Sequence, residues 1–423
     1  MTEVKKLRIC MVLESTKFPN DVRVAKESRA LLAAGHEVFL ITLSKGQQRY
    51  EENINGVHVR FLPNRPRTKS PLRMLIYALS FIDPMWVRAA NEVIRQHGID
   101  VLHVHDLALV KTGSIVARKR GIPLVADLHE NYPEGVREWR RDMGWLGVLS
   151  RAVFPVWRFK RLEKTSLKHA SNVLVVCDES WKHYEEDCHV PREKLATVLN
   201  TVDVRTLHGI PLDDRLIDSY RYSFVISYIG GYAPHRGLKT TIYAMRTILE
   251  SVPTARLIIV GHAKPAYTRE LQALVEQCDV AEHVEFVGYV DFEKVPSYIT
   301  LSDVCLVPHE VSGHTNSGMP HKFFQYMSFG KPVVVSNCIP MQNVVETYQA
   351  GIVFSEKQSS ELARSVIRVH SEQGLASVLG EGGKRAVKER YNWDHDARNL
   401  CGVYATIAKR LNPTSDNNAY RRS

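Results

Sequence analysis

The sequence of 423 residues has only seven cysteines, and the closest two, Cys177 and Cys188, are eleven positions apart. This spacing provides neither a Cys-x-x-Cys metal pair nor a disulfide framework, and it fits a reducing compartment. Long apolar runs are also missing, since the run near the N-terminus covers only residues 9–13 and is too short for a signal-peptide core or a membrane span. We therefore expect a cytoplasmic protein with no metal site, peripheral to the inner face of a membrane rather than embedded in it.

Several nucleotide-binding and catalytic motifs are missing as well. There is no G-x-x-x-x-G-K-[ST] loop, and the turn after the first predicted strand lacks G-x-G-x-x-G, which disfavours P-loop NTPases and standard NAD enzymes. G-x-S-x-G, H-E-x-x-H and EF-hand patterns are absent. Asp394-His395-Asp396 is a triplet of the kind that can hold a divalent metal, but its place at the start of a late helix favours capping by aspartate.

Short apolar runs alternate with amphipathic segments along most of the chain. This alternation predicts parallel sheets covered by helices on both faces. Residues 200–223 have no such periodicity and predict a linker, so the chain divides into two domains of roughly 200 residues each. The predicted strands are residues 7–13, 37–43, 101–104, 123–127, 172–177 and 195–199 in the first domain, and 224–229, 256–260, 283–286, 304–307 and 332–336 in the second.

The fold class that follows is α/β, with two Rossmann-like, doubly wound parallel-sheet domains facing each other across a cleft. We place the domains at residues 1–205 and 206–394, and we expect a C-terminal helix at about residues 395–415 to pack back on the first domain. Doubly wound sheets bind ligands beyond the carboxyl ends of their strands. The loops that follow the strands are therefore the candidate sites.

Polar residues occupy three such positions in the first domain. A histidine at the carboxyl end of a strand can donate a hydrogen bond to a substrate hydroxyl, and its near-neutral pKa also permits proton transfer. Asp21 has an alternative role as the cap of the first helix. We expect one of His103 and His105 to point away from the other, because side chains alternate along a strand. The candidates are Asp21, Arg23, His105, Asp106, His129 and Glu130.

The second domain has two candidate anion-binding segments. In the first, Gly230 and Gly231 follow a strand and allow the backbone to approach a diphosphate, while Arg236 at a helix mouth can pair with phosphate oxygens. The alternative for this segment is an ordinary turn. The second is a long polar loop that ends in a helix near Pro320.

That loop and helix carry several groups suited to a nucleotide. We expect the backbone amides of Ser317, Gly318 and Met319 to point at a ligand in front of the helix. Lys322 adds a positive charge, and Gln325 can hydrogen-bond a sugar diol. The alternative is an amphipathic helix whose polar start is solvated.

Six segments in their order resemble the retaining nucleotide-sugar glycosyltransferases of glycosyltransferase family 4, which have the GT-B fold. They are DVRVAKESRALLAAGHEV, VHVHD, DLHENYPE, RGLKTTIYAM, EHVEFVGYV followed by LSDVCLVP, and PHKFFQYMSFGKPVVVS. The resemblance implies transfer of a hexosyl or related group from a nucleoside-diphosphate sugar, with a UDP-sugar expected, to an acceptor hydroxyl with retained configuration and no cofactor. The first domain would bind a glycan or lipid-linked acceptor, and the second would bind the donor.

The resemblance also assigns roles to the candidate residues. The catalytic group would be His129, Asp106 and Glu130, with Asp21, Arg23 and His105 on the acceptor side. Arg236 stands where the family has a phosphate-binding lysine, and Gln325 stands where a glutamate usually grips the ribose. The family's E-x₇-E pair reads Ser317 and Gln325 here, so we hypothesise that Lys322 supplies the missing phosphate charge and that Glu310 or the loop amides replace the first glutamate.

The net charge of +10 lies almost wholly in residues 1–200, where Lys and Arg exceed Asp and Glu by nine. Residues 135–170 carry nine basic side chains interleaved with Trp139, Trp145 and Trp157, which suits contact with an anionic membrane. A solvated basic face is the alternative, and no nucleic-acid-binding motif accompanies the charge. Besides a glycosyltransferase of surface polysaccharide or glycolipid assembly, a catalytically silent partner subunit and a GT-B sugar-nucleotide epimerase remain as alternatives.

Overall fold

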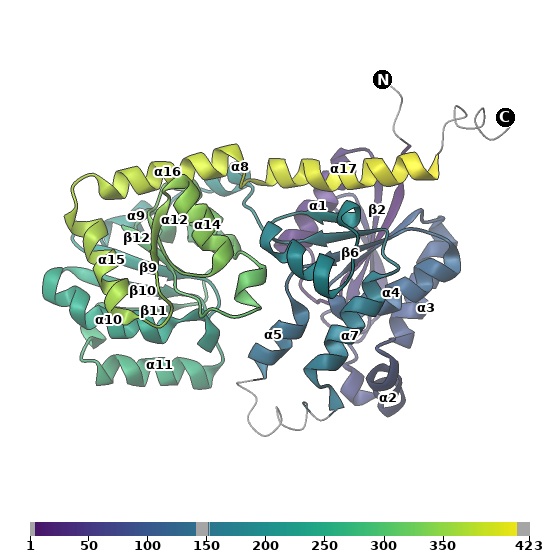
Figure 1. Cartoon of the computed structure of the whole chain (residues 1–423), viewed down its shortest axis with the longest axis horizontal. Helices are drawn as coiled ribbons and strands as arrows, with labels where there is room; N and C mark the ends of the chain where they lie inside the picture. Colours follow the sequence, from purple (N-terminus) through teal and green to yellow (C-terminus); the bar gives the residue numbers. More distant parts are fainter. Residues whose placement is uncertain (1–4, 141–150, 152, 413–423) are drawn as a thin grey trace. The chain divides into compact units, whose positions relative to one another are not determined.

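The computed structural model describes residues 5–140, 151 and 153–412 (Figure 1). The chain forms two compact units. The first contains the described residues up to Val198 together with those from Asp396 onward, and the second contains Leu199–His395. No helix in the described part of the chain is long and apolar enough to cross a membrane.

The first unit is built on an eight-stranded sheet with the order β3-β4-β2-β1-β5-β6-β7-β8. All neighbouring strands run parallel except β3 and β4. Apart from Arg8, which is exposed at the start of its strand, the central strands are buried on both faces, as their largely apolar sequences predict. The strands are β1 (Arg8–Val12), β2 (Glu37–Leu43), β3 (Tyr50–Ile54), β4 (Val57–Leu62), β5 (Val101–His105), β6 (Leu124–Leu128), β7 (Asn172–Val175) and β8 (Leu195–Thr197).

The antiparallel hairpin of β3 and β4 was not predicted, and it departs from the expected all-parallel sheet. Tyr50 pairs with Phe61 and Ile54 with Val57, so a tight turn joins the two strands. Strand β3 has the sequence YEENI and is exposed along most of its length, because it lies at the edge of the sheet. An exposed polar edge strand has no apolar pattern from which it could be recognised.

The helices of the first unit pack around this sheet. Asp21 accepts a hydrogen bond from the backbone N–H of Val24, so the helix cap suggested by the sequence is confirmed. Helix α4 ends at Gly121, which adopts a left-handed conformation. The helices are α1 (Val22–Ala33), α2 (Pro71–Ser80), α3 (Pro84–His97), α4 (Leu107–Arg120), α5 (Tyr132–Trp139), α7 (Val156–Leu167) and α17 (Trp393–Leu411).

Helix α17 returns to the first unit after the second unit has been completed. It was expected at about residues 395–415, of which residues 413–415 lie outside the described part. Asn392 accepts a hydrogen bond from the N–H of His395, whereas Asp394 pairs with Arg205 at 2.7 Å. The prediction that aspartate caps this helix is therefore wrong in detail, because the asparagine one residue before the helix takes that position.

The second unit is built on a six-stranded, fully parallel sheet with the order β11-β10-β9-β12-β13-β14. Its strands are β9 (Phe224–Ile229), β10 (Ala255–Val260), β11 (Val284–Gly288), β12 (Val304–Val307), β13 (Val333–Ser336) and β14 (Gly351–Phe354). Its helices are α8 (Val204–His208), α9 (Asp214–Asp218), α10 (Leu238–Ser251), α11 (Pro265–Gln277), α12 (Val295–Thr300), α13 (His321–Ser328), α14 (Ile339–Tyr348), α15 (Ser359–Ser371) and α16 (Leu375–Glu389). The predicted linker thus contains two short helices, and the short strand β14 was not predicted.

Candidate active site

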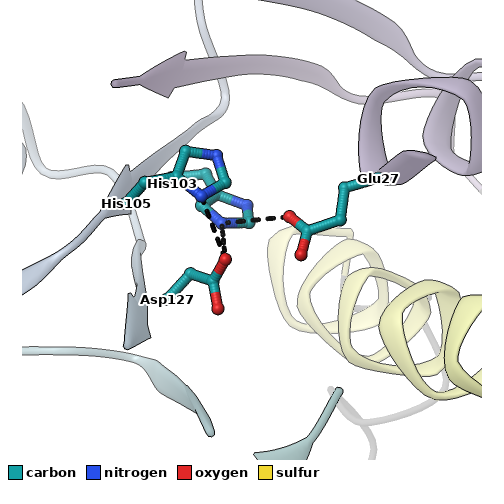
Figure 2. A group of neighbouring side chains, drawn as sticks. All are labelled: Glu27, His103, His105 and Asp127. Carbon is teal, nitrogen blue, oxygen red and sulfur yellow. Dashed lines mark hydrogen bonds and ion pairs between the residues drawn. The ribbon is translucent and has the colours of Figure 1, made fainter. Parts of the chain in front are cut away.

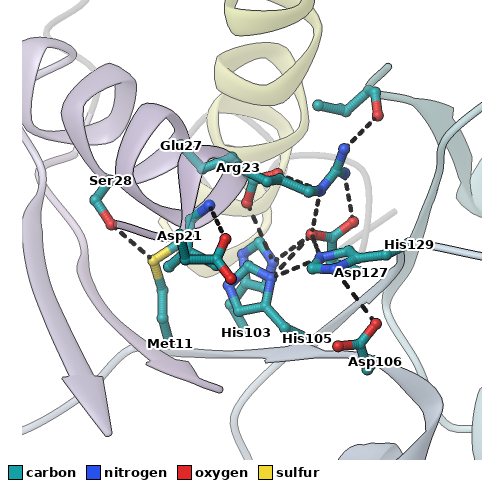
Figure 3. Close-up of polar contacts among 12 residues, drawn as sticks. Met11, Asp21, Arg23, Glu27, Ser28, His103, His105, Asp106, Asp127 and His129 are labelled. Atoms are coloured by element: carbon teal, nitrogen blue, oxygen red, sulfur yellow. Dashed lines mark hydrogen bonds and ion pairs between the residues drawn. The ribbon is translucent and has the colours of Figure 1, made fainter. Parts of the chain in front are cut away.

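A buried group of polar side chains lies at the carboxyl ends of β5 and β6 in the first unit (Figure 3). We call it the polar cluster, and its members come from α1, from the two strands and from the loops that follow them. Arg23, Glu27, His103, His105 and Asp127 are each 4% exposed or less. The cluster consists of Arg23, Glu27, His103, His105, Asp106, Asp127 and His129.

Arg23 and Asp127 form the centre of the polar cluster. The guanidinium of Arg23 donates to both carboxylate oxygens of Asp127, at 3.0 and 2.6 Å, and to the carbonyl oxygen of Val198 at 2.9 Å. It also lies 3.0 Å from a carboxylate oxygen of Glu27. Although burial opposes ionisation, Arg23 and His129 hold the pKa of Asp127 well below its usual range. Asp127 is therefore a permanently charged anchor for the histidines around it.

His103 and His105 lie on the same face of β5, with ring centroids 4.4 Å apart (Figure 2). The expectation that one of them points away from the other is wrong, because residues two positions apart in a strand share a face. His103 shares a 2.6 Å hydrogen bond with the hydroxyl of Tyr404 in α17. Burial, together with the neighbouring His103, lowers the pKa of His105 to about 3, so His105 is neutral and hydrogen-bonds Asp127 at 2.9 Å.

His129 and Asp106 are the members of the cluster that reach the surface, with 21% and 39% of their side chains exposed. Nε2 of His129 lies 2.9 Å from Asp127, and its Nδ1 lies 3.3 Å from Asp106. Burial opposes a charge on this ring, but the two carboxylates outweigh that effect and raise the pKa of His129 to about 9. His129 is thus a cation at neutral pH and a hydrogen-bond donor rather than a general base.

Asp106 has a backbone conformation that L-residues rarely adopt, with φ at +62° and ψ at 143°. Such a conformation costs about 1–3 kcal/mol and persists only where surrounding contacts enforce it. Asp106 lies at the junction of β5 and α4, and its carboxylate reaches the ring of His129. Glu130 follows His129 in a bend and is half-buried.

Glu27, His103, His105 and Asp127 place one ligand atom each within 4.8 Å of one another, which raises the question of a metal (Figure 2). Arg23 already contacts both carboxylates of this set. His129 adds a second positive charge beside Asp127. A divalent cation would therefore enter a site whose negative charge is already compensated, and the burial of excess charge is costly. We interpret these four residues as part of a network of ion pairs and hydrogen bonds that holds His129, in which Glu27 is mostly protonated at neutral pH.

In the second unit, Lys322 lies at the first turn of α13 beside the glycine pair. Its Nζ is 3.4 Å from the centre of the Tyr228 ring, is shielded from solvent, and has no hydrogen-bond partner among the described residues. A side chain at Gly230 would meet this ammonium at 3.1 Å, so the glycine leaves room for it. Burial, followed by the nearby charge of Arg236, holds the pKa of Lys322 well below its usual range. An anion in front of α13 would satisfy this group.

Arg236 lies next to the loop that follows β12. One of its guanidinium nitrogens is 3.1 Å from Nε2 of His309, a buried residue whose pKa is lowered by burial and by Arg236. Gly237 makes this approach possible, because it has a φ of +74° and a Cβ there would lie 1.7 Å from the carbonyl oxygen of Pro308. The segment is therefore more than an ordinary turn, since it fixes Arg236 against a second loop.

The polar loop before α13 differs in part from the prediction. Ser317 donates its amide to the carbonyl of His314 and its hydroxyl to that of Gly313, so the expectation that its amide faces a ligand is wrong. Among the described residues the amides of Gly318 and Met319 have no such partner. Gln325 is half-buried one turn after Lys322, and Glu310 forms a 3.3 Å ion pair with Lys357.

Sequence reasoning missed several residues that hold the two groups in place. Glu27 belongs to the polar cluster, and Tyr404 supports it through its hydrogen bond with His103. Tyr326 ties α13 to β9 by accepting from the N–H of Ile229 at 2.8 Å. Tyr228 covers Lys322 and donates to the carbonyl of Gly231 at 2.9 Å. A polar residue on an otherwise apolar helix face or strand was the available signal for each of them, but such residues are also common in ordinary cores.

Comparisons with known proteins agree with these observations. The family model described as "Glycosyl transferase 4-like domain" matches residues 21–201, and the model "Glycosyl transferases group 1" matches residues 217–386. An uncharacterised glycosyltransferase of Methanocaldococcus jannaschii is 26% identical over 395 residues, which cover 89% of this chain and 91% of that protein.

Solved structures show the same fold. Sucrose-phosphate synthase from Thermosynechococcus elongatus has a TM-score of 0.77 at 18% identity, covering 95% of this chain and 99% of that one. Anabaena HepE in complex with UDP-glucose has a TM-score of 0.68 at 16% identity, covering 96% and 100%. The two doubly wound α/β units therefore define a GT-B fold. The chain belongs to the glycosyltransferases of the family 4 type.

Proposed function

We propose that this glycosyltransferase moves a sugar from a nucleoside-diphosphate sugar to an acceptor hydroxyl with retention of anomeric configuration. The observation that carries the proposal is Lys322, whose shielded ammonium has no hydrogen-bond partner among the described residues. A diphosphate is the ligand that such a group fits, since α13 and α10 begin nearby and a helix N-terminus favours anions. We assign the donor to the second unit, and the UDP-glucose bound by HepE makes a UDP-sugar the first choice.

In this proposal the positive groups do most of the catalytic work. Charge develops on the departing diphosphate, so Lys322 and Arg236 would stabilise the transition state as fixed cations. Gly230, Gly231, Gly318 and Met319 would let the backbone approach the donor, and Gln325 would hydrogen-bond the ribose. Neither Ser317 nor Glu310 has a side chain available to replace the family's first glutamate. The hydroxyl of Ser317 donates to the carbonyl of Gly313, and Glu310 pairs with Lys357.

We assign the polar cluster of the first unit to the sugar and the acceptor. His129 would donate a hydrogen bond to a sugar hydroxyl from Nδ1, whose contact with Asp106 is an ion pair at 3.3 Å, while Nε2 stays hydrogen-bonded to Asp127. Arg23 and His105 would act through Asp127, since both are buried and bonded to it. Asp21 and Glu130 remain candidates for contact with the acceptor.

The experiment that tests this proposal is a titration of the full-length protein with UDP-, GDP- and TDP-sugars, followed by thermal unfolding. A bound donor raises the midpoint by an amount that grows with the logarithm of its concentration over its Kd. NMR of the product with a suitable acceptor then reports whether the anomeric configuration is retained. Binding of a donor without transfer to any acceptor would favour an epimerase, and no binding at all would favour a catalytically silent partner subunit.

We also propose a lipid-linked acceptor at an anionic membrane surface, as in glycolipid or surface polysaccharide assembly. Three leucines of α2, Leu72, Leu75 and Leu79, are 69%, 55% and 74% exposed, and Trp157 of α7 is 61% exposed. Arg158 joins the two helices by donating to the carbonyl of Ala78. Trp145 of the predicted tryptophan-rich patch lies outside the described residues.

A basic groove adjoins these apolar side chains. Leu79 and Trp157 line it together with Lys111, Arg118, Arg158 and Arg161. Exposed apolar side chains beside clustered basic ones are typical of surfaces that bind anionic lipid. Flotation with phosphatidylserine-containing vesicles, but not with neutral ones, is the expected result, and failure to float with either would exclude this part of the proposal.

A further inference from the structure

Three side chains with metal-binding atoms meet in the first unit, away from the polar cluster. Glu163 lies in α7, His183 begins a short π-helical segment (His183–Asp187), and Cys188 follows that segment. Glu163 and Cys188 are 1% and 4% exposed, and the side chain of His183 is 21% exposed. A π-helical turn is rare and often occurs at functional sites. Here it brings His183 and Cys188 to the same carboxylate.

The distances among the three ligand atoms are those of one face of a tetrahedron. Oε2 of Glu163 lies 2.9 Å from Nε2 of His183 and 3.5 Å from Sγ of Cys188, and Sγ lies 3.8 Å from Nε2. A tetrahedral zinc ion with bonds of about 2.0 Å to nitrogen and oxygen and about 2.3 Å to sulfur would require separations of roughly 3.3–3.6 Å. The ion would therefore fit with shifts of a few tenths of an ångström.

Two further observations point to a cation. The other ring nitrogen of His183, Nδ1, lies 2.9 Å from a carboxylate oxygen of Asp187, which is the arrangement that orients histidine ligands in metal sites. The second carboxylate oxygen of Glu163, Oε1, is buried and has no hydrogen-bond partner among the described residues. An unsatisfied buried carboxylate oxygen is costly, and a nearby cation would offset that cost.

We propose that Glu163, His183 and Cys188 bind a zinc ion that ties α7 to the segment before β8. The set of one thiolate, one imidazole and one carboxylate suits Zn²⁺ and does not suit Mg²⁺ or Ca²⁺, which prefer oxygen ligands alone. On binding, the thiol proton of Cys188 passes to solvent and the thiolate becomes a ligand. A water molecule completes the tetrahedron, since the protein supplies three ligands.

The test uses the metal-free, full-length protein and Co²⁺ as a spectroscopic substitute for zinc. One Co²⁺ per chain is expected to bind with a thiolate-to-cobalt charge-transfer absorption, and Zn²⁺ is expected to abolish that absorption by displacement. Zn²⁺ alone should raise the thermal midpoint of the wild type by an amount that grows with the logarithm of its concentration over its Kd. Wild-type protein without the charge-transfer absorption would overturn the proposal, and the three side chains would then form only a hydrogen-bonded network.

Variants separate this site from the other cysteines and histidines. Cys188→Ser is expected to lose the absorption, whereas Cys401→Ser, a matched change of a half-buried cysteine in α17, keeps it. Asp187→Asn should weaken zinc affinity by about 10- to 100-fold while it leaves the absorption in place at saturation. His183→Gln keeps the test decisive if Cys188→Ser fails to fold, because the histidine is partly exposed. Absorption that survives in Cys188→Ser, or a Co²⁺ affinity that is unchanged in His183→Gln, would contradict the assignment.

Discussion

The ammonium of Lys322 lies 3.4 Å from the centre of the Tyr228 ring, and the ring shields one side of it from water. An aromatic face stabilises a cation by about 0.5–2 kcal/mol, which is less than a full counter-ion provides. Tyr228 itself is fixed, because it is fully buried and donates to the carbonyl of Gly231. Among the described residues the lysine has no counter-ion, and burial and Arg236 hold its pKa low, so a bound diphosphate would be the group that restores its charge.

Lys322→Ala is expected to lower sugar transfer by about 100-fold, because removal of one fixed transition-state donor typically costs that much. The midpoint increase caused by UDP should shrink as well. Lys239→Ala in α10, a surface lysine that pairs with Glu270, is the matched control and should change little. Near-normal transfer by Lys322→Ala, measured as kcat/KM for the donor, would remove Lys322 from the site.

His129→Asn is expected to lower kcat by about 100-fold or more with a smaller effect on the binding of the nucleotide alone, because the proposed role is contact with the sugar. Asp106→Asn should act in the same direction, since loss of its charge lowers the pKa of His129 from about 9. The rate of Asp106→Asn should then fall at a lower pH than that of the wild type. If the rates of Asp106→Asn and of the wild type fall at the same alkaline pH, Asp106 does not stabilise the protonated form of His129.

Glu27 makes the stability of the first unit depend on pH. Burial, and then Asp127, raise the pKa of Glu27 from 4.5 to about 8, so the folded protein binds more protons than the unfolded chain between these values. The free energy of unfolding therefore falls as pH rises through this window, and the loss is complete above pH 8. His129 acts in the same direction between pH 6.5 and about 9.

Glu27→Gln keeps a neutral side chain at every pH. Its free energy of unfolding should be close to that of the wild type near pH 5 and should exceed it by about 1 kcal/mol or more near pH 9. Urea unfolding at both pH values measures the difference, with the exposed substitution Glu250→Gln as the control. A difference that shrinks as the pH rises would mean that Glu27 is ionised in the folded protein.

Gly237→Ala is expected to destabilise the second unit by more than about 2 kcal/mol, since it combines a positive φ with a Cβ placed 1.7 Å from the carbonyl oxygen of Pro308. Gly402→Ala in α17 provides the contrast, because a Cβ there meets nothing within 4 Å. That change should stabilise the protein by about 0.5–1 kcal/mol. Thermal or urea unfolding of the two variants gives the comparison.

Replacement of Leu72, Leu75 and Leu79 together by glutamine should abolish flotation with anionic vesicles and leave transfer to a water-soluble acceptor unchanged. Glutamine at the exposed tyrosines Tyr243 and Tyr289 of the second unit is the control, since these residues are 53% and 71% exposed but lie outside α2. Equal flotation of the two variants would assign vesicle binding to another surface.

The buried strands of both sheets could be predicted from the sequence, because a short, continuous apolar run between two helices is typical of a strand covered on both faces. Strand β3 could not be predicted in the same way, since its edge position makes YEENI polar and exposed. The strand-end residues His129 and Asp106 could be selected from their positions. The ion pair of Asp106 with His129 and that of Arg23 with Asp127 depend on the neighbouring order of β1, β5 and β6, which no local pattern contains.

Two predictions about the site were wrong for different reasons. One concerned the orientation of His103 and His105, and the other concerned the amide of Ser317. The two histidines share a face by the simple period of a strand, which the sequence does contain. The amide of Ser317 is used by a local turn in a loop, where backbone hydrogen bonds follow no periodic rule. The meeting of Glu163 with His183 and Cys188 has no local spacing signature, because Glu163 lies in α7 and the other two lie at the start and directly after the end of the later π-helical segment.

The 2.6 Å hydrogen bond between His103 and Tyr404 has a consequence for synthesis of the chain. Tyr404 belongs to α17, which is translated after the whole second unit, yet it fills the interior of the first unit. During translation, residues 199–395 can complete their own core before the first unit receives its last helix. A chain truncated before residue 396 would leave the ring of His103 with an empty space beside it. Premature termination therefore removes part of the core of the first unit, although most of that unit is translated first.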